Sequence, residues 1–163
     1  MNVRSILISA FLALVLSGCG QKEAAPASTA AVEAPAAGPR VVEITANDTM
    51  KFSVTAIEAK AGKQLKVILT NAGTQPKEAM GHNWVLLKAG SDAGAFANAA
   101  VAAKETNYIP AALKAQIIAS IDLLGPRKSG EVVFTVPGPG EYPFLCSFPA
   151  HFAIGMKGTL IVK

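Results

Sequence analysis

Three side chains that bind soft metals lie close together near the C-terminal end of the chain. Cys146, His151 and Met156 occur in the stretch CSFPAHFAIGM, with four residues between each consecutive pair. A single loop with this spacing can turn a thiolate, an imidazole and a thioether toward one point. His82, the other histidine of the chain, lies in EAMGHNWVLL and can complete the set from a neighbouring strand.

This set of donor atoms has a specific chemistry. Two imidazoles and one thiolate, with a thioether as a weak axial donor, are the ligands of electron-transferring blue-copper sites. Zinc also accepts two histidines and a cysteine, but a catalytic zinc site needs a carboxylate or another water-activating group, and the loop carries neither. The residues therefore predict one mononuclear copper held by His82, Cys146, His151 and Met156. They indicate a carrier of single electrons and not an enzyme.

Other functions use the same residue types. A copper protein that stores or delivers the ion without redox chemistry is the alternative, although such sites tend to be Met/His-rich and often lack a thiolate. A Cys–His hydrolase would need an Asn or Asp that orients His151, and none lies nearby. A copper enzyme such as a nitrite reductase would need further histidines, whereas the chain has two in all. The structural alternative is a buried, inert Cys146.

Short β-type segments must position these residues. From Val41 onward, runs that alternate apolar and polar residues are separated by turn signals such as Ala61-Gly62 and Pro137-Gly138-Pro139-Gly140. We expect strands in VVEIT, MKFSVTAIEA, KQLKVILTN, HNWVLLK, EVVFTV, EYPFLC and MKGTLIVK. Many short strands joined by Gly/Pro turns predict an all-β sandwich or barrel.

One stretch interrupts the β pattern. SDAGAFANAAVAAKE, from Ser91, opens with capping residues and is rich in alanine, which favours a helix. AALKAQIIAS, residues 111–120, is ambiguous, and we expect a strand to begin near Gln116. The whole pattern is compatible with a Greek-key sandwich that carries one helical insertion, with Trp84 packed in the core.

The N-terminal segment is typical of an exported protein. MNVRSILISAFLALVLSGCG has a basic residue, an apolar run too short to span a bilayer, and small residues before Cys19. Its end resembles the lipobox of bacterial lipoproteins, which implies a signal peptide over 1–18 and a lipid on Cys19 that anchors the chain in a membrane. We therefore expect an exported chain that faces the periplasm or the cell exterior. If Cys19 carries lipid, Cys146 has no cysteine to pair with.

Residues 19–40 and 41–163 differ in composition. The first segment is Ala/Pro-rich and has no aromatic residue, so it predicts a flexible tether, and the second is long enough for one compact domain. Charges in the second segment are scattered without a basic run, so nucleic-acid binding is not predicted.

Two motifs of the domain carry a family resemblance. MGHNWV, residues 80–85, together with CSFPAHFAIGMKGTL, residues 146–160, resembles the azurin/auracyanin-like cupredoxins, and VEITANDTMKFSVTAIEAKAGKQLKV is similar to their opening strands. The resemblance implies an eight-stranded Greek-key β-sandwich with a single type 1 copper.

The resemblance also assigns further roles around the metal. It implies that the carbonyl of Gly81 is a second axial donor, and that Asn83 ties the two ligand segments together by hydrogen bonds. It implies that the backbone N–H of Phe148 donates to the sulfur of Cys146. Hydrogen bonds of this kind fix the orientation of metal ligands and tune the metal.

Three features depart from azurin. Azurins place three residues between the second histidine and the methionine, whereas His151 and Met156 are separated by four, as in auracyanin. This spacing affects the expected contacts of Met156 and the Gly81 carbonyl. The disulfide usual near the start of azurins is absent, and Asn71 stands where many azurins have a histidine that does not bind copper.

Partners follow from the same resemblance. In the family the second histidine ligand reaches the surface inside an apolar patch that docks redox proteins. We expect this patch to comprise Met80, Phe152, Ala153 and Ile154, while Phe148 fits either the patch or the packing beneath it. The expected partners are redox proteins such as c-type cytochromes, or membrane respiratory or photosynthetic complexes.

Overall fold

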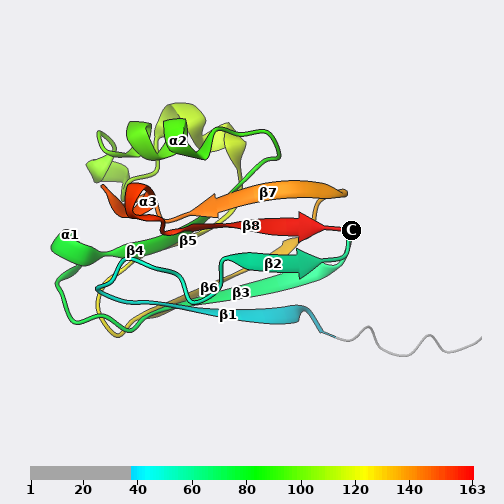
Figure 1. Cartoon of the computed structure of the whole chain (residues 1–163), viewed down its shortest axis with the longest axis horizontal. Helices are drawn as coiled ribbons and strands as arrows, with labels where there is room; N and C mark the ends of the chain where they lie inside the picture. The colour runs from blue at the N-terminus through cyan, green and yellow to red at the C-terminus, as the bar shows by residue number, and fades with distance from the viewer. Residues whose placement is uncertain (1–37) are drawn as a thin grey trace, which may run out of the picture. The chain divides into compact units, whose positions relative to one another are not determined.

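The computed structural model describes residues 38–163 as a β-sandwich. One sheet has the strand order β1-β3-β6, with β1 at Arg40–Ala46, β3 at Gln64–Asn71 and β6 at Ser129–Thr135. The other has the order β2-β8-β7-β4-β5, with β2 at Ala56–Ala59, β8 at Lys157–Val162, β7 at Gly140–Leu145, β4 at His82–Leu87 and β5 at Ile117–Leu124. The eight strands confirm the predicted all-β sandwich (Figure 1).

The strand pairing shows that the chain passes between the two sheets several times. β1 pairs with β3 in parallel and β2 pairs with β8 in parallel, while the other pairs are antiparallel. Several neighbours in a sheet are therefore distant in the sequence, such as β3 and β6 or β4 and β7. This places the start of β4 and the segment after β7, which carry the predicted ligands, at the same end of the second sheet.

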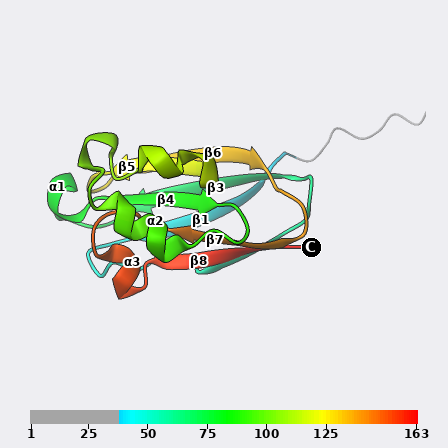
Figure 2. The same ribbon diagram turned by 90° about the horizontal axis from the view of Figure 1, so that it is seen from above.

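Most of the helical residues lie in one insertion between β4 and β5. This insertion contains α2 at Ala93–Ala100 and two 3₁₀ turns, η1 at Lys104–Thr106 and η2 at Ala111–Gln116. Figure 2 shows it on the outer side of the five-stranded sheet. Two further short helices, α1 at Lys77–Met80 and α3 at His151–Ile154, adjoin the predicted ligands.

The insertion explains the unusual burial of β4. All six residues of this strand are buried. Trp84 and Leu86 face the core between the sheets, whereas Val85 and Leu87 face Phe96 of α2 in a second hydrophobic cluster. Because both faces of β4 are covered, the strand is apolar from Trp84 to Leu87 instead of alternating.

Two predicted elements have different bounds in the structure. The predicted strand MKFSVTAIEA is strand only at Ala56–Ala59, because the chain changes sheets within it: Phe52 bridges to Ala46 of β1, and Ala56 pairs with Thr159 of β8. The predicted helix from Ser91 is shorter than expected. Asp92 caps it by accepting a hydrogen bond from the N–H of Ala95 at 2.9 Å.

The remaining boundaries lie close to the predicted ones. β5 begins at Ile117, next to the expected Gln116, and β1 begins at Arg40, one residue before the expected start of the domain. Within residues 38–163, no helix is long and apolar enough to cross a membrane. The predicted signal peptide, the lipidated Cys19 and residues 20–37 of the tether lie outside the described residues.

Candidate metal centre

The ends of two neighbouring strands and the loop after one of them position the predicted ligands. His82 is the first residue of β4, Cys146 directly follows β7, and His151 is the first residue of α3. Met156 directly precedes β8, where its backbone closes the loop. The N–H of Met156 donates to the carbonyl of His151 at 2.9 Å, and the N–H of Cys146 donates to the carbonyl of Met156 at 3.0 Å.

The loop has the tight turns that this closure requires. Ala150 and Gly155, which flank α3, both have left-handed backbone conformations, with φ of 68° and 99°. Glycine adopts this conformation without a steric penalty, so Gly155 suits the position between α3 and Met156. Gly155, one of the four residues between His151 and Met156, thus allows the chain to turn back toward β8.

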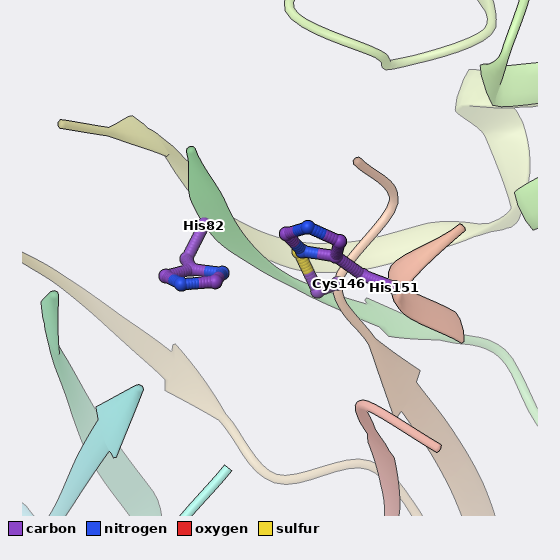
Figure 3. Close-up of side chains that lie close together, drawn as sticks. All are labelled: His82, Cys146 and His151. Atoms are coloured by element: carbon purple, nitrogen blue, oxygen red, sulfur yellow. The ribbon is translucent and has the colours of Figure 1, made fainter. Parts of the chain in front are cut away.

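Three side chains converge at the centre of this region (Figure 3). The ligand atoms of His82, Cys146 and His151 all lie within 4.8 Å of one another. The sulfur of Cys146 is 3.4 Å from Nδ1 of His151, and the two imidazole centroids are 5.0 Å apart. The three residues are 0%, 0% and 2% exposed, so the cluster is enclosed by protein.

Comparison with known proteins assigns this cluster. Residues 40–163 match the family model of the copper binding proteins, plastocyanin/azurin family. The chain belongs to this family. It is 39% identical to azurin of Pseudomonas denitrificans over 126 residues, which cover 75% of this chain and 97% of that protein. It is 34% identical to auracyanin-B of Chloroflexus aurantiacus, over 76% of this chain and 52% of that protein.

Solved structures of auracyanins share the fold. Auracyanin A of Chloroflexus aurantiacus, described as a blue copper protein, superposes with a TM-score of 0.69 at 32% identity, covering 77% of this chain and 100% of that chain. The dithionite-reduced auracyanin of Roseiflexus castenholzii gives a TM-score of 0.68 at 34% identity, covering 76% and 96%. Together with the His82–Cys146–His151 cluster, these relatives confirm the prediction of a blue-copper electron carrier with one type 1 copper.

The protonation of the cluster fits a copper ion. Burial raises the pKa of the Cys146 thiol to about 12, although backbone N–H groups of Asn83 and Phe148 oppose this rise. Burial also lowers the pKa of His151 to about 4, helped by the proximity of His82, and it lowers the pKa of His82. Both imidazoles are therefore neutral donors at pH 7, whereas the thiol needs a cation beside it to become a thiolate.

His82 gives an independent sign of a missing partner. Neither of its ring nitrogens forms a hydrogen bond of ordinary geometry among residues 38–163, although the backbone carbonyl of Asn47 lies near enough to oppose the lowering of its pKa. A buried polar atom without a partner costs free energy, on the order of 1–3 kcal/mol. A bound metal would satisfy one of these nitrogens, so the residues present fit the copper that the family implies.

Asn83 joins the two segments that carry the ligands. Its side-chain N–H donates to Oγ of Ser147 at 2.7 Å, and its side-chain oxygen accepts from the N–H of Ser147 at 2.8 Å. Ser147 in turn donates from Oγ to the carbonyl of Tyr108 at 2.7 Å. All three residues are buried, so this chain of bonds ties β4, the ligand loop and the insertion together.

Ser147 and Tyr108 are the functional neighbours that sequence reasoning missed. Ser147 directly follows the predicted ligand Cys146, and this position in the sequence could have indicated its role. No sequence feature indicated Tyr108, because it lies 40 positions before Phe148 in the sequence. In the structure its ring packs edge-on against that of Phe148, with centroids 4.9 Å apart. Phe148 packs in turn against His151, with centroids 4.7 Å apart, and is 8% exposed. Of its two expected roles, Phe148 has the packing role beneath His151.

The other predicted site residues lie around the cluster. Met156 is fully buried, and Gly81 is buried where a Cβ would approach the Lys77 carbonyl to 2.7 Å. Of the expected patch, Ile154 is 47% exposed and Ala153 is also exposed, whereas Met80 and Phe152 are half-buried. The ring of Phe152 lies beneath the ammonium group of Lys157, at 4.4 Å.

Proposed function

We propose that the chain is an exported, lipid-anchored protein that shuttles single electrons between redox partners. It would comprise a signal peptide over 1–18, a lipidated Cys19 with its tether over 19–40, and the copper domain over 41–163. The observation that carries the redox part is the enclosed His82–Cys146–His151 cluster. The N-terminal sequence supports the lipid anchor, and we propose no enzymatic activity.

Within the site, we propose that His82, Cys146 and His151 are the trigonal ligands. Met156 would be the axial ligand, and the carbonyl of Gly81 would be a second, weaker axial donor. A bound copper would supply a one-electron couple between Cu(II) and Cu(I). This ligand set combines soft sulfur donors, which suit Cu(I), with imidazoles, which suit both oxidation states.

The chain's contribution is a fixed ligand geometry. The bonds between Asn83 and Ser147 hold the start of β4 against the ligand loop. The N–H groups of Asn83 and Phe148 at the sulfur stabilise negative charge on the thiolate. A site held in this way changes little between oxidation states, which favours fast electron transfer.

Partners would dock at the end that carries α3. We propose that Met80, Phe152, Ala153 and Ile154 form the contact patch, because Ala153 and Ile154 are exposed in the helix α3 that begins with His151. The relatives imply redox proteins in general. Within that class we propose a c-type cytochrome or a respiratory or photosynthetic membrane complex.

The test of the redox function is a spectrum followed by a titration. The copper-loaded protein should show an intense visible absorption from thiolate-to-Cu(II) charge transfer, and a reversible one-electron titration should remove and restore it. A colourless Cu(II) adduct would instead support storage or delivery of copper. The lipid anchor is tested separately by the mass of the mature N-terminal peptide, which Cys19→Ser should return to its unlipidated value.

A further inference from the structure

A basic groove lies at the opposite end of the domain from the metal centre. It has a volume of about 490 Å³ and lies beside the first residue of β1 and the last residue of the chain. Leu65 and Val136 are buried residues at its base, and Arg40, Lys60, Lys63 and Lys163 are exposed around it. Figure 1 shows this end of β1 and β8 on the side away from α1 and α3.

The charges of the groove are unbalanced. Glu58 is its one acidic residue, and it already pairs with Lys163 at 3.0 Å, while its backbone carbonyl accepts from Arg40. Lys60 and Lys63 form no ion pair with any of the described residues. Four cations therefore surround an apolar base with a single carboxylate among them, which suits a ligand that is anionic and partly apolar.

The position of the groove on the chain indicates which ligand that is. Arg40 is the first residue of β1 and the last residue of the predicted tether, so 20 residues separate this end of the domain from Cys19. An unfolded chain of this length spans roughly 25 Å. A lipid on Cys19 therefore keeps the groove close to the bilayer surface.

We propose that this basic groove binds the anionic phospholipid headgroups of the membrane in which Cys19 is anchored. The proposal rests on the lipid anchor proposed above. Each cationic residue near an anionic bilayer surface contributes to binding. This attraction decays over one Debye length from the surface, so it acts only on residues that stay close to the bilayer. The tether supplies a high local concentration, so a weak headgroup contact suffices to orient the domain.

This contact directs the metal centre away from the membrane. β7 runs from Gly140, which pairs with Val162 beside the groove, to Leu145, which precedes Cys146. Six strand residues at about 3.4 Å each separate the two ends by roughly 20 Å. With the groove on the bilayer, the patch around Ile154 faces the aqueous phase, where a soluble redox partner can reach it.

The test uses the copper-loaded chain from Gly20 onward, which lacks Cys19 and cannot be lipidated. Residues 38–163 contain both sheets and both hydrophobic clusters, so this chain keeps every strand and helix that the structure describes. It should co-sediment with phosphatidylcholine vesicles that contain about one third phosphatidylglycerol. It should not bind vesicles of phosphatidylcholine alone, and high salt should release it.

Matched variants locate the contact. The pair Lys60→Gln and Lys63→Gln should weaken vesicle binding about 30-fold, from about 5-fold for each cation. The pair Lys104→Gln and Lys128→Gln makes the same change in net charge away from the groove and should leave binding unchanged. Equal weakening by both pairs, or equal binding to both kinds of vesicle, would overturn the proposal. The visible copper band of the same samples reports the metal centre separately, so failure here leaves the electron carrier intact.

Discussion

At the scale of single residues, the metal centre depends on a thiol that the protein alone would keep protonated. Cys146 is fully buried, and its pKa of about 12 favours the neutral form at pH 7. The neutral imidazoles of His82 and His151 add no positive charge. A metal cation is therefore what converts Cys146 to the thiolate, and copper binding should release one proton.

Replacing that sulfur removes the feature that defines the site. Cys146→Ser should abolish the visible thiolate-to-copper band while the far-ultraviolet circular dichroism stays that of the β-sandwich. Cys19→Ser makes the same chemical change outside the described residues and should leave the band intact. Absorption spectra of the two copper-loaded variants check this, and a visible band that survives in Cys146→Ser would mean that another ligand dominates.

Met156 should tune the reduction potential without deciding whether copper binds. Met156→Leu keeps the volume of a fully buried side chain but removes a weak donor. The loss costs the more highly charged Cu(II) more than Cu(I), which is stable with fewer ligands. The potential should rise by several tens of millivolts, since about 59 mV corresponds to a tenfold change in relative affinity for the two oxidation states. Redox titration measures this, with Met50→Leu as the control. An unchanged potential in Met156→Leu would argue against axial ligation.

At the scale of elements, the side chain of Asn83 joins the start of β4 to the ligand loop by hydrogen bonds. It is buried and forms two bonds to Ser147, so truncation leaves the Ser147 N–H without its acceptor. Asn83→Ala should lower the free energy of unfolding by about 1–3 kcal/mol. Chemical denaturation measures this against Asn98→Ala, an exposed position on α2 where the change should stay within about 0.5 kcal/mol. Similar losses in both variants would deny the bridging role.

The packing of β8 against its neighbours leaves no space at Gly158. A Cβ there would lie 2.2 Å from the ring of Phe144 and 2.3 Å from the carbonyl of Thr55. Gly158→Ala should therefore lower the free energy of unfolding by about 1–3 kcal/mol, which is the typical cost of overpacking a core. Gly138→Ala, where a Cβ meets nothing within 4 Å, is the control for thermal unfolding. Equal melting temperatures for the two variants would contradict this account of the β7–β8 contact.

The elements also show what the sequence could predict. The ligand loop was predictable because the spacing of Cys146, His151 and Met156 is local, and most strands followed from their alternation. The sheet change between Phe52 and Ala56 was not predictable, because an alternating run does not indicate which sheet each half joins. The bond from Ser147 to Tyr108 was equally hidden, since it depends on where the insertion folds back.

At the scale of the whole molecule, the two ends of the sandwich carry different surfaces. Ile154 is one of four exposed large hydrophobic residues among those described, and it is the last residue of α3, three positions after the ligand His151. The basic groove lies at the other end, where β1 begins. This separation lets one end face a membrane while the other end exchanges electrons, so a change at the patch should affect partner kinetics alone.

Ile154→Asp tests that separation. A charge in the centre of an apolar contact should slow the second-order electron transfer with a c-type cytochrome about tenfold, the equivalent of about 1.4 kcal/mol in the encounter complex. The visible spectrum and the potential should not change, because Ile154 is exposed and is not a ligand. Val133→Asp places the same charge at a similarly exposed residue of β6, in the other sheet, and should leave the rate unchanged. Stopped-flow kinetics distinguishes the two cases: equal slowing by both variants would mean that net charge, and not the patch beside His151, governs the encounter.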